Sequence, residues 1–520
     1  MDNSHINHRF PFLMISHKLD GSESLDSRGH PSSDIQAPSE LEDHDGLPAI
    51  GSISLVQHDA SIEVLSDDVL LAVFGFYLAS SSWDWHRLAH VCQRWRLIVF
   101  ASSRSLDLQL YCTPRTPVKK TIDYWPAFPI NIRCGRSRHA DASCERLFPE
   151  DGDNVIAALQ RHNRVRSIDL CLTYSVMEKL STRVKEPLSE LEDLVLRSIS
   201  SRHFFPSNLP FRWSSRLRVL NLTDISLPSL PLLLSSSPNL VDLQLRRSSE
   251  FPPPVALANA LSGMTRLESL SLLSDSFHHA GAPLPSGRRV ILPALTQLKF
   301  RGYSQYLEGL VAEIDAPCLG KIDITFVGLV NSLSEIGQFI NLIEAQRSHS
   351  RAEIRTNMND ISIWFTPGPS EFEYPSSPYF VLRIHRTRLN HQLSSMGFVC
   401  DLFPPFLLGT GDLGIVTRPP SSEQDDIDAE NWLRLLRSFS RAERFYVAGE
   451  LATDIMHALQ RVDGDFATVL PALRKLYVAM ESGSPCEAFQ AAVASFKTAR
   501  QLSGRPIEVE CYSGTRLGTG

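Results

Sequence analysis

Hydrophobic and polar residues change their spacing twice along this 520-residue chain. Residues 1–60 mix Ser, Asp, Glu, His, Gly and Pro without apolar periodicity, which predicts a disordered tail. From residue 61 apolar residues recur every three or four positions, the spacing of amphipathic helices. From residue 106 they alternate with polar residues in short runs, which predicts strands. We therefore expect three segments, at 1–60, 61–105 and 106–520.

The segment 61–105 predicts two or three short helices. Ser66 is suited to cap the first helix, and Asp67 and Asp68 place negative charge in its first turn. Apolar side chains follow at helical spacing, and after a Ser-rich turn at 80–82 they recur along a second helix. The residues are Leu70, Val73, Phe74 and Tyr77 on the first helix, and Leu88, Val91, Cys92, Trp95, Ile98 and Val99 on the second.

A six-residue pattern, L-x-x-L-x-L, repeats through the third segment. Strict copies start at Leu191, Leu217, Leu240 and Leu267, and looser ones at Val165, Leu295, Leu319, Met358, Tyr379, Ala442 and Leu473. From residue 165 to 319 the starts lie 23 to 28 residues apart, within the period of about 20 to 29 residues of leucine-rich repeats. We predict an α/β solenoid, a degenerate leucine-rich-repeat horseshoe. The alternative is an ordinary α/β domain with Leu-rich strands.

Two parts of this segment fit the repeat less directly. The fragments 106–110 and 130–132 are candidates for its first strands. Residues 386–441, which include four prolines, have no assigned register.

The residues between the leucines of each copy should face outward on the concave side. Among them Arg197, Arg246, Lys299 and Arg301, together with Gln244, form a candidate substrate-binding set. A basic track of this kind suits an acidic or phosphorylated segment. The alternative is a solvated face of mixed charge.

Charge and cysteine usage narrow the class of protein. The first 60 residues hold ten acidic and three basic residues, which accounts for the net charge of −7. The remaining 48 acidic and 48 basic residues balance, so nothing favours nucleic-acid binding. Nine scattered cysteines without a CxxC pair indicate reduced thiols. With no leader pattern and no apolar run long enough for a membrane span, we expect a cytoplasmic or nuclear protein without a membrane partner.

Motifs that would carry chemistry are weak. His86 and His90 have the spacing of a zinc-binding helix, but Arg87 stands where the protease pattern needs Glu. Gly409, Gly411 and Gly414 match G-x-G-x-x-G, but the prolines on both sides predict a turn before a strand rather than a dinucleotide loop. We therefore expect no metal, no cofactor and no catalytic residues: the chain is not predicted to be an enzyme.

The helical segment resembles an F-box, a domain whose pattern is Leu-Pro, an acidic pair, Leu, Ile-Phe, and then Val-Cys-x-x-Trp-Arg on a later helix. The matching residues are Leu65, Val69, Leu70, Val73 and Phe74, then Leu88, Val91, Cys92, Trp95 and Arg96. Ser66 replaces the usual Pro. The continuation to residue 134 is similar to that of fungal F-box proteins with degenerate leucine-rich repeats.

This resemblance implies a substrate-receptor subunit of an SCF-type cullin-RING ubiquitin ligase. The matched residues, Arg96 apart, would dock a Skp-family adaptor, and the repeats would hold a protein substrate. The receptor would act by proximity and do no chemistry itself. One alternative is a repeat scaffold without a ligase, in which the helices cap the solenoid. The other is an enzyme within residues 386–441.

Overall fold

The computed structural model describes most of the chain beyond residue 61. The described residues are 62–80, 85–113, 116–123, 126–133, 152–184, 186–198, 215–225, 229–246, 251–274, 289–328, 330, 333–344, 350–357, 359–366, 379–385, 388–403, 407–417, 428–448, 452–460, 469–480 and 487–513. The predicted tail at 1–60 lies outside them. The chain divides into two compact units, one up to residue 108 with 123–126, the other comprising 109–122 and 127–520.

The first unit is helical. A 3₁₀ turn η1 (Ile62–Val64) precedes α1 (Asp67–Ser80), α2 (Trp85–Val91) and α3 (Gln93–Ala101). The predicted cap of α1 is confirmed, because the Val69 N–H donates to the Ser66 Oγ at 3.4 Å. Asp67 and Asp68 lie in the first turn, where negative charge is favourable.

The predicted second helix is in fact two helices. The chain is extended at Cys92, with φ −153° and ψ 172°, and this residue caps α3. Its sulfur accepts a hydrogen bond from the Trp95 N–H at 3.5 Å. The apolar periodicity does not predict this break, because cysteine counts as a hydrophobic residue although its thiol can also cap a helix.

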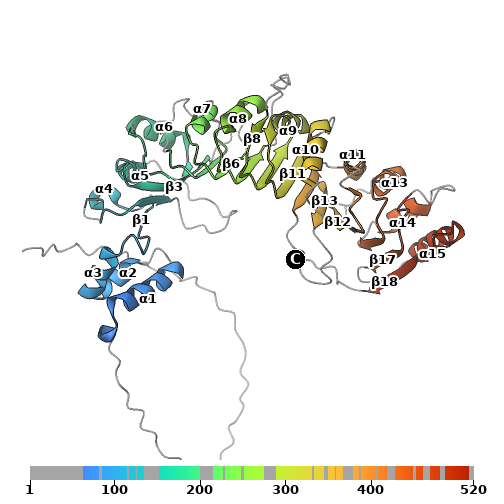
Figure 1. Cartoon of the computed structure of the whole chain (residues 1–520), viewed down its shortest axis with the longest axis horizontal. Helices are drawn as coiled ribbons and strands as arrows, with labels where there is room; N and C mark the ends of the chain where they lie inside the picture. Colours follow the sequence, from blue (N-terminus) through green and yellow to red (C-terminus); the bar gives the residue numbers. More distant parts are fainter. Residues whose placement is uncertain are drawn as a thin grey trace, which may run out of the picture. The chain divides into compact units, whose positions relative to one another are not determined.

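In the residues that the structure describes, the second unit is built on one sheet of sixteen strands, with helices on one face (Figure 1). The first strands are β1 (Leu110–Cys112), β2 (Ile130–Arg133), β3 (Val165–Leu172), β4 (Asp193–Ser198), β5 (Val219–Thr223), β6 (Asp242–Arg246), β7 (Ser269–Leu273), β9 (Gln297–Gly302) and β11 (Lys321–Val327). The later strands are β14 (Phe380–His385), β13 (Asp360–Thr366), β12 (Arg351–Thr356), β15 (Asp412–Thr417), β16 (Arg444–Ala448), β17 (Lys475–Met480) and β18 (Glu508–Ser513), given in spatial order. A separate pair joins β8 (Val290–Ile291) to β10 (Ile314–Asp315).

Helices return the chain from one strand to the next. They are α4 (Val118–Thr121), α5 (Gly152–Leu159), α6 (Tyr174–Arg183), α7 (Leu230–Ser235), α8 (Pro254–Leu261), α9 (Ser304–Val311), α10 (Ser334–Glu344), α11 (Leu389–Asp401), α13 (Ala429–Arg437), α14 (Ala452–Gln460) and α15 (Glu487–Leu502). In the described residues no helix combines the length and apolar character that a bilayer span requires.

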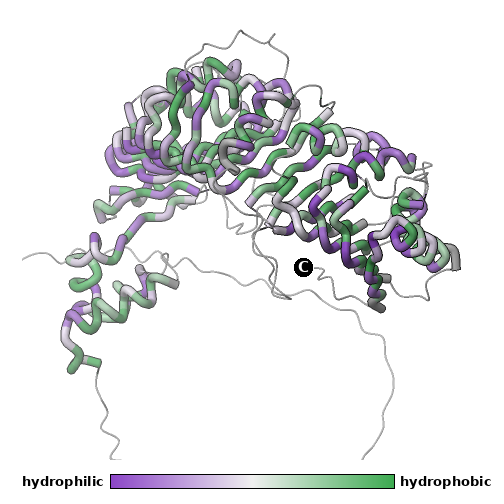
Figure 2. The backbone as a smooth tube through the Cα atoms, turned by 45° about the vertical axis from the view of Figure 1, so that its right-hand side comes forward, coloured by the Kyte–Doolittle hydropathy of each residue, from purple (hydrophilic) through white to green (hydrophobic). Residues whose placement is uncertain are grey.

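The repeat pattern produces this sheet because its leucines stack in register. One inward row runs across five neighbouring strands, and every side chain in it is at most 1% exposed. The row consists of Leu194, Leu220, Leu243, Leu270 and Leu298. Hydrophobic and hydrophilic positions alternate along these strands (Figure 2). Parallel strands joined by helices at a regular spacing form an α/β solenoid, as the sequence predicts.

The strands expected at Met358 and Tyr379 are present, but not as successive parallel repeats. β13 runs antiparallel to both β12 and β14, and the spatial order of these three strands is reversed. A short turn causes the reversal: Asn357 Oδ1 accepts the N–H groups of Asn359 and Asp360 at 2.8 and 2.9 Å. This side-chain turn folds β12 back onto β13 before a helix can form.

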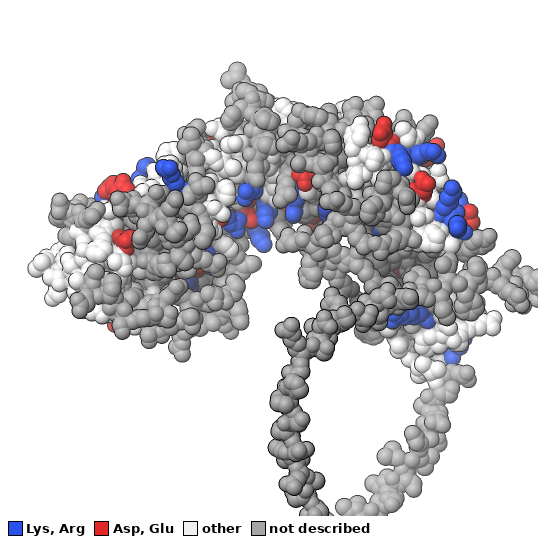
Figure 3. Space-filling model, turned by 180° about the vertical axis from the view of Figure 1, so that it is seen from behind, with Lys and Arg blue, Asp and Glu red and all other residues white. Residues whose placement is uncertain are grey.

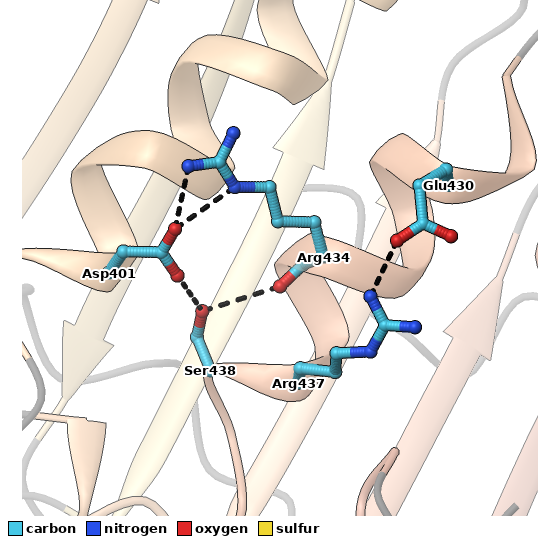
Figure 4. Close-up of polar contacts among 5 residues, drawn as sticks. All are labelled: Asp401, Glu430, Arg434, Arg437 and Ser438. Atoms are coloured by element: carbon cyan, nitrogen blue, oxygen red, sulfur yellow. Dashed lines mark hydrogen bonds and ion pairs between the residues drawn. The ribbon is translucent and has the colours of Figure 1, made fainter. Parts of the chain in front are cut away.

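The unassigned segment 386–441 belongs to the same solenoid. It contributes α11, β15 and α13, and β15 begins inside the G-x-G-x-x-G stretch, so the predicted turn before a strand is confirmed. Asp401 at the end of α11 accepts two hydrogen bonds from Arg434 of α13, at 2.8 and 2.9 Å (Figure 4). The two helices pack side by side as neighbouring repeats.

Candidate functional site

The first helix exposes a stripe of apolar side chains. Leu65 lies just before α1, and Val69, Val73 and Phe76 follow it at intervals of four, four and three residues, which places these three along one side of the helix. Their exposed fractions are 38%, 46%, 49% and 82%. We call these four residues the α1 stripe. An apolar row of this kind is unusual on a helix that already buries its opposite side.

The core of the helical unit lies on the other side of α1. Leu70 and Phe74 are fully buried, and Leu88 of α2 is 7% exposed. The rings of Phe74 and Trp95 lie 4.7 Å apart. Leu70, Phe74 and Leu88, three of the predicted adaptor-binding residues, thus fill the interior of their own unit, and their contact with an adaptor stays a prediction.

The remaining predicted adaptor-binding residues differ in location and in exposure. Leu65, Val69 and Val73 are in the α1 stripe, whereas Val91 and Cys92 are exposed at the junction of α2 and α3. Trp95 is half-buried against Phe74. Their binding role stays a prediction.

Sequence reasoning missed Phe76, and it also missed Val64 and Leu97, which are 82% and 63% exposed. The signal for Phe76 was present, since it lies three residues after Val73 and seven after Val69. The F-box-like pattern does not include these three positions.

An ion pair ties the start of α1 to α3. Arg94 donates to Asp67 Oδ1 from Nη2 at 2.7 Å and from Nε at 2.9 Å, and its Nη2 also reaches the Leu65 carbonyl. This contact fixes the first turn of the α1 stripe with respect to α3. The pair is largely exposed, so its contribution to stability is small.

His86 and His90 are both exposed on α2. The ring of His86 lies edge-on to Trp85 at 6.3 Å. No group of three or more His, Cys, Asp or Glu side chains suited to a metal occurs among the residues that the structure describes.

The second surface is the face of the large sheet that the helices leave open. The five predicted substrate-binding residues, Arg197, Gln244, Arg246, Lys299 and Arg301, all lie on it. Lys and Arg side chains gather here with Asp and Glu among them (Figure 3).

Acidic neighbours pair with part of the predicted basic track. Arg197 pairs with Asp169 of the adjacent strand at 2.8 Å, and Lys299 pairs with Asp323 at 3.4 Å. Gln244 accepts from Asn221 and Arg246 at 3.2 and 3.3 Å. From β3 to β11 the face therefore carries charges of both signs, and the binding role of the five residues stays a prediction.

Aromatic side chains on this face were missed by sequence reasoning. Trp364 of β13 lies beneath two arginines, Arg355 at 4.3 Å and Arg383 at 5.4 Å from its ring centre. Tyr446 and Tyr477 stack in register on neighbouring strands, 4.4 Å apart and 6° from parallel. These pairings depend on strand order, which no local pattern reveals.

Comparisons with known proteins assign neither a family nor a function to this chain. No protein-family model matches the chain, and no curated protein is significantly similar to it. Among solved structures it is similar to the leucine-rich repeat-containing protein LegL7 from Legionella pneumophila, at 12% identity and a TM-score of 0.26. That match covers 70% of this chain and 97% of the other. The solenoid assignment therefore rests on the sheet order and strand spacing of this chain itself.

Proposed function

We propose that this chain is a non-catalytic substrate receptor of an SCF-type cullin-RING ubiquitin ligase, acting in the cytoplasm or nucleus. The α1 stripe docks a Skp-family adaptor, and the open face of the solenoid binds a protein substrate. The receptor then raises the local concentration of substrate lysines at the ligase.

The observation that supports this proposal is the α1 stripe itself. A short helical unit gains stability by burying apolar side chains, yet this unit leaves Leu65 exposed before α1 and three more apolar residues exposed on α1, at a spacing that suits a partner helix. The F-box-like residues Leu65, Val69 and Val73 belong to this stripe, whereas the buried matches Leu70 and Phe74 form the core. The unit thus has both a core and a surface able to bind.

A direct test is co-expression of the full chain with a fungal Skp-family adaptor, followed by a binding measurement on the purified proteins. We expect a one-to-one complex for the wild type. Val73→Asp and Phe76→Asp should each weaken binding by at least about tenfold, because a carboxylate would be buried without a partner.

The matched control is Leu232→Asp, which places the same charge on a 77% exposed leucine of α7 in the other unit. It should leave adaptor binding unchanged. A folded wild type that shows no binding at tens of micromolar adaptor rules out the ligase assignment and leaves a repeat scaffold for protein interactions.

A further inference from the structure

Three arginines line up across the open face of the solenoid. Arg301 of β9, Arg383 of β14 and Arg355 of β12 occupy one register row, separated by Thr325 and Ser362. The two intervening side chains are small and buried. Successive arginine positions in the row are therefore separated by two strand spacings, about 9.6 Å along the backbone. We call these three residues the arginine row.

The reversed strands β12 to β14 bring two members of the row together around an indole. Arg355 and Arg383 both lie over the ring of Trp364, and such cation–π contacts hold a guanidinium in place. Arg355 also donates from Nε to Glu353 Oε1 at 2.6 Å, and Arg383 pairs with Asp323. Two members of the arginine row are thus held by both an aromatic ring and a carboxylate.

The carboxylates do not neutralise this part of the face, because each is shared by two bases. Asp323 contacts Lys299 and Arg383, and Glu353 contacts Arg351 and Arg355. The side chains of the two acids are only 18% and 17% exposed, whereas those of the four bases are 27% to 53% exposed. The four basic side chains thus lie further outward than the two acidic ones. Together with Arg301 on the same face, they make this surface electropositive.

The spacing of the row specifies a partner. A polyproline II helix has three residues per turn and a rise of about 3.1 Å per residue, so every third side chain points the same way at intervals of about 9.3 Å. We propose that the arginine row binds a protein segment in the polyproline II conformation that carries an anionic group at every third residue. This assignment rests on the proposed use of the open face for substrate binding and names the substrate's chemistry.

The test uses the full chain and fluorescent peptides, with fluorescence anisotropy as the readout. The first peptide repeats Glu-Pro-Pro three times, and the control has the same composition with Glu at every second position. We expect the first to bind at least about tenfold more tightly, since the respaced peptide loses charge-assisted contacts. Binding should weaken as salt is added.

A third peptide, with phosphoserine in place of Glu at the same spacing, separates two sources of negative charge. Tighter binding of this peptide identifies phosphate as the preferred anion, and equal binding shows that carboxylate suffices. Either result supports the proposal that the arginine row binds regularly spaced anionic groups. Equal binding of the spaced and respaced peptides, or binding of none of the three, overturns the proposal.

Variants locate the site. Arg383→Gln and Arg301→Gln should each weaken binding of the spaced peptide about tenfold. The matched control Arg437→Gln, on helix α13 and not on the open sheet face, should leave affinity unchanged. A folded Arg383→Gln protein that binds like the wild type contradicts the proposal. Adaptor binding, measured on the same preparations, should be unaffected in all three variants, so failure of the ligase assignment and failure of the arginine row are distinguishable.

Discussion

Leu70 and Val73 stand three residues apart on α1 and occupy opposite environments. Leu70 is fully buried, whereas Val73 is half exposed. A family pattern treats both as matched apolar positions, but only one of them is available to a partner. At the scale of single residues, burial separates the residues that fold the unit from those that can bind.

This separation gives a stability prediction. Leu70→Ala should lower the free energy of unfolding of the helical unit by about 2 to 5 kcal/mol, because it leaves a cavity. Val73→Ala shortens a side chain that is half exposed and should change this free energy by less than about 0.5 kcal/mol. Hydrogen exchange of the α1 and α3 amides in the full chain measures both effects. Equal losses of protection in the two variants would show that Val73 belongs to the core.

Cys92 illustrates how a residue can satisfy a pattern and break the element the pattern predicts. Its position continues the apolar periodicity of the surrounding helix. Its backbone is extended and its sulfur caps α3. Sequence periodicity depends on side-chain polarity and does not specify the backbone angles. For this reason the sequence predicts one helix where the structure has two.

Among the elements, α9 and α10 are joined by a half-buried carboxylate. Glu308 Oε2 accepts the Glu335 N–H at 2.9 Å and so caps the first turn of α10. Burial raises the pKa of Glu308, although the hydrogen bonds from the backbone of Glu335 and Ile336 oppose the shift.

The sign of this shift fixes a pH dependence. The folded state holds the Glu308 proton more tightly than the unfolded chain, so its contribution to stability is complete below the unfolded pKa, about 4.3, and is lost as pH rises through the folded pKa. Glu308→Gln keeps an oxygen that can accept from Glu335 and removes the titration. The stability of this variant relative to wild type should therefore increase from about pH 4 to pH 7, as measured by thermal unfolding. Parallel pH profiles would contradict the assignment.

The reversed strands β12 to β14 are the element that distinguishes this solenoid from a simple repeat. Asn357 supports the turn that reverses the chain, and Trp364, Arg355 and Arg383 are all contributed by these strands. The sequence predicts β13 and β14 from their alternation, but β12 is not among its predicted strands. The antiparallel pairing of the three strands was not detectable from alternation, because it depends on the turn and on the partner strands available.

At the scale of the solenoid, each strand contacts only its neighbours, so stability should be coupled over short distances. Leu243→Ala on β6 is expected to destabilise its surroundings by about 2 to 5 kcal/mol. Hydrogen exchange should increase most in β5, β6 and β7 and least in β17 and β18, far along the sheet. A uniform increase over all strands would indicate one cooperative unit instead.

The chain's own sequence determined the repeat, its period and the inward leucines, because these depend on residue spacing within about 30 positions. The tertiary structure decided which F-box-like residues are buried, where Cys92 ends a helix, and how β12 to β14 are ordered. It also decided the composition of the arginine row, in which Arg301 and Arg355 lie on strands far apart in the sequence. Such groupings arise from strand order and strand register. Hydrogen bonding between segments distant in the sequence sets the order and the register, whereas local residue spacing does not.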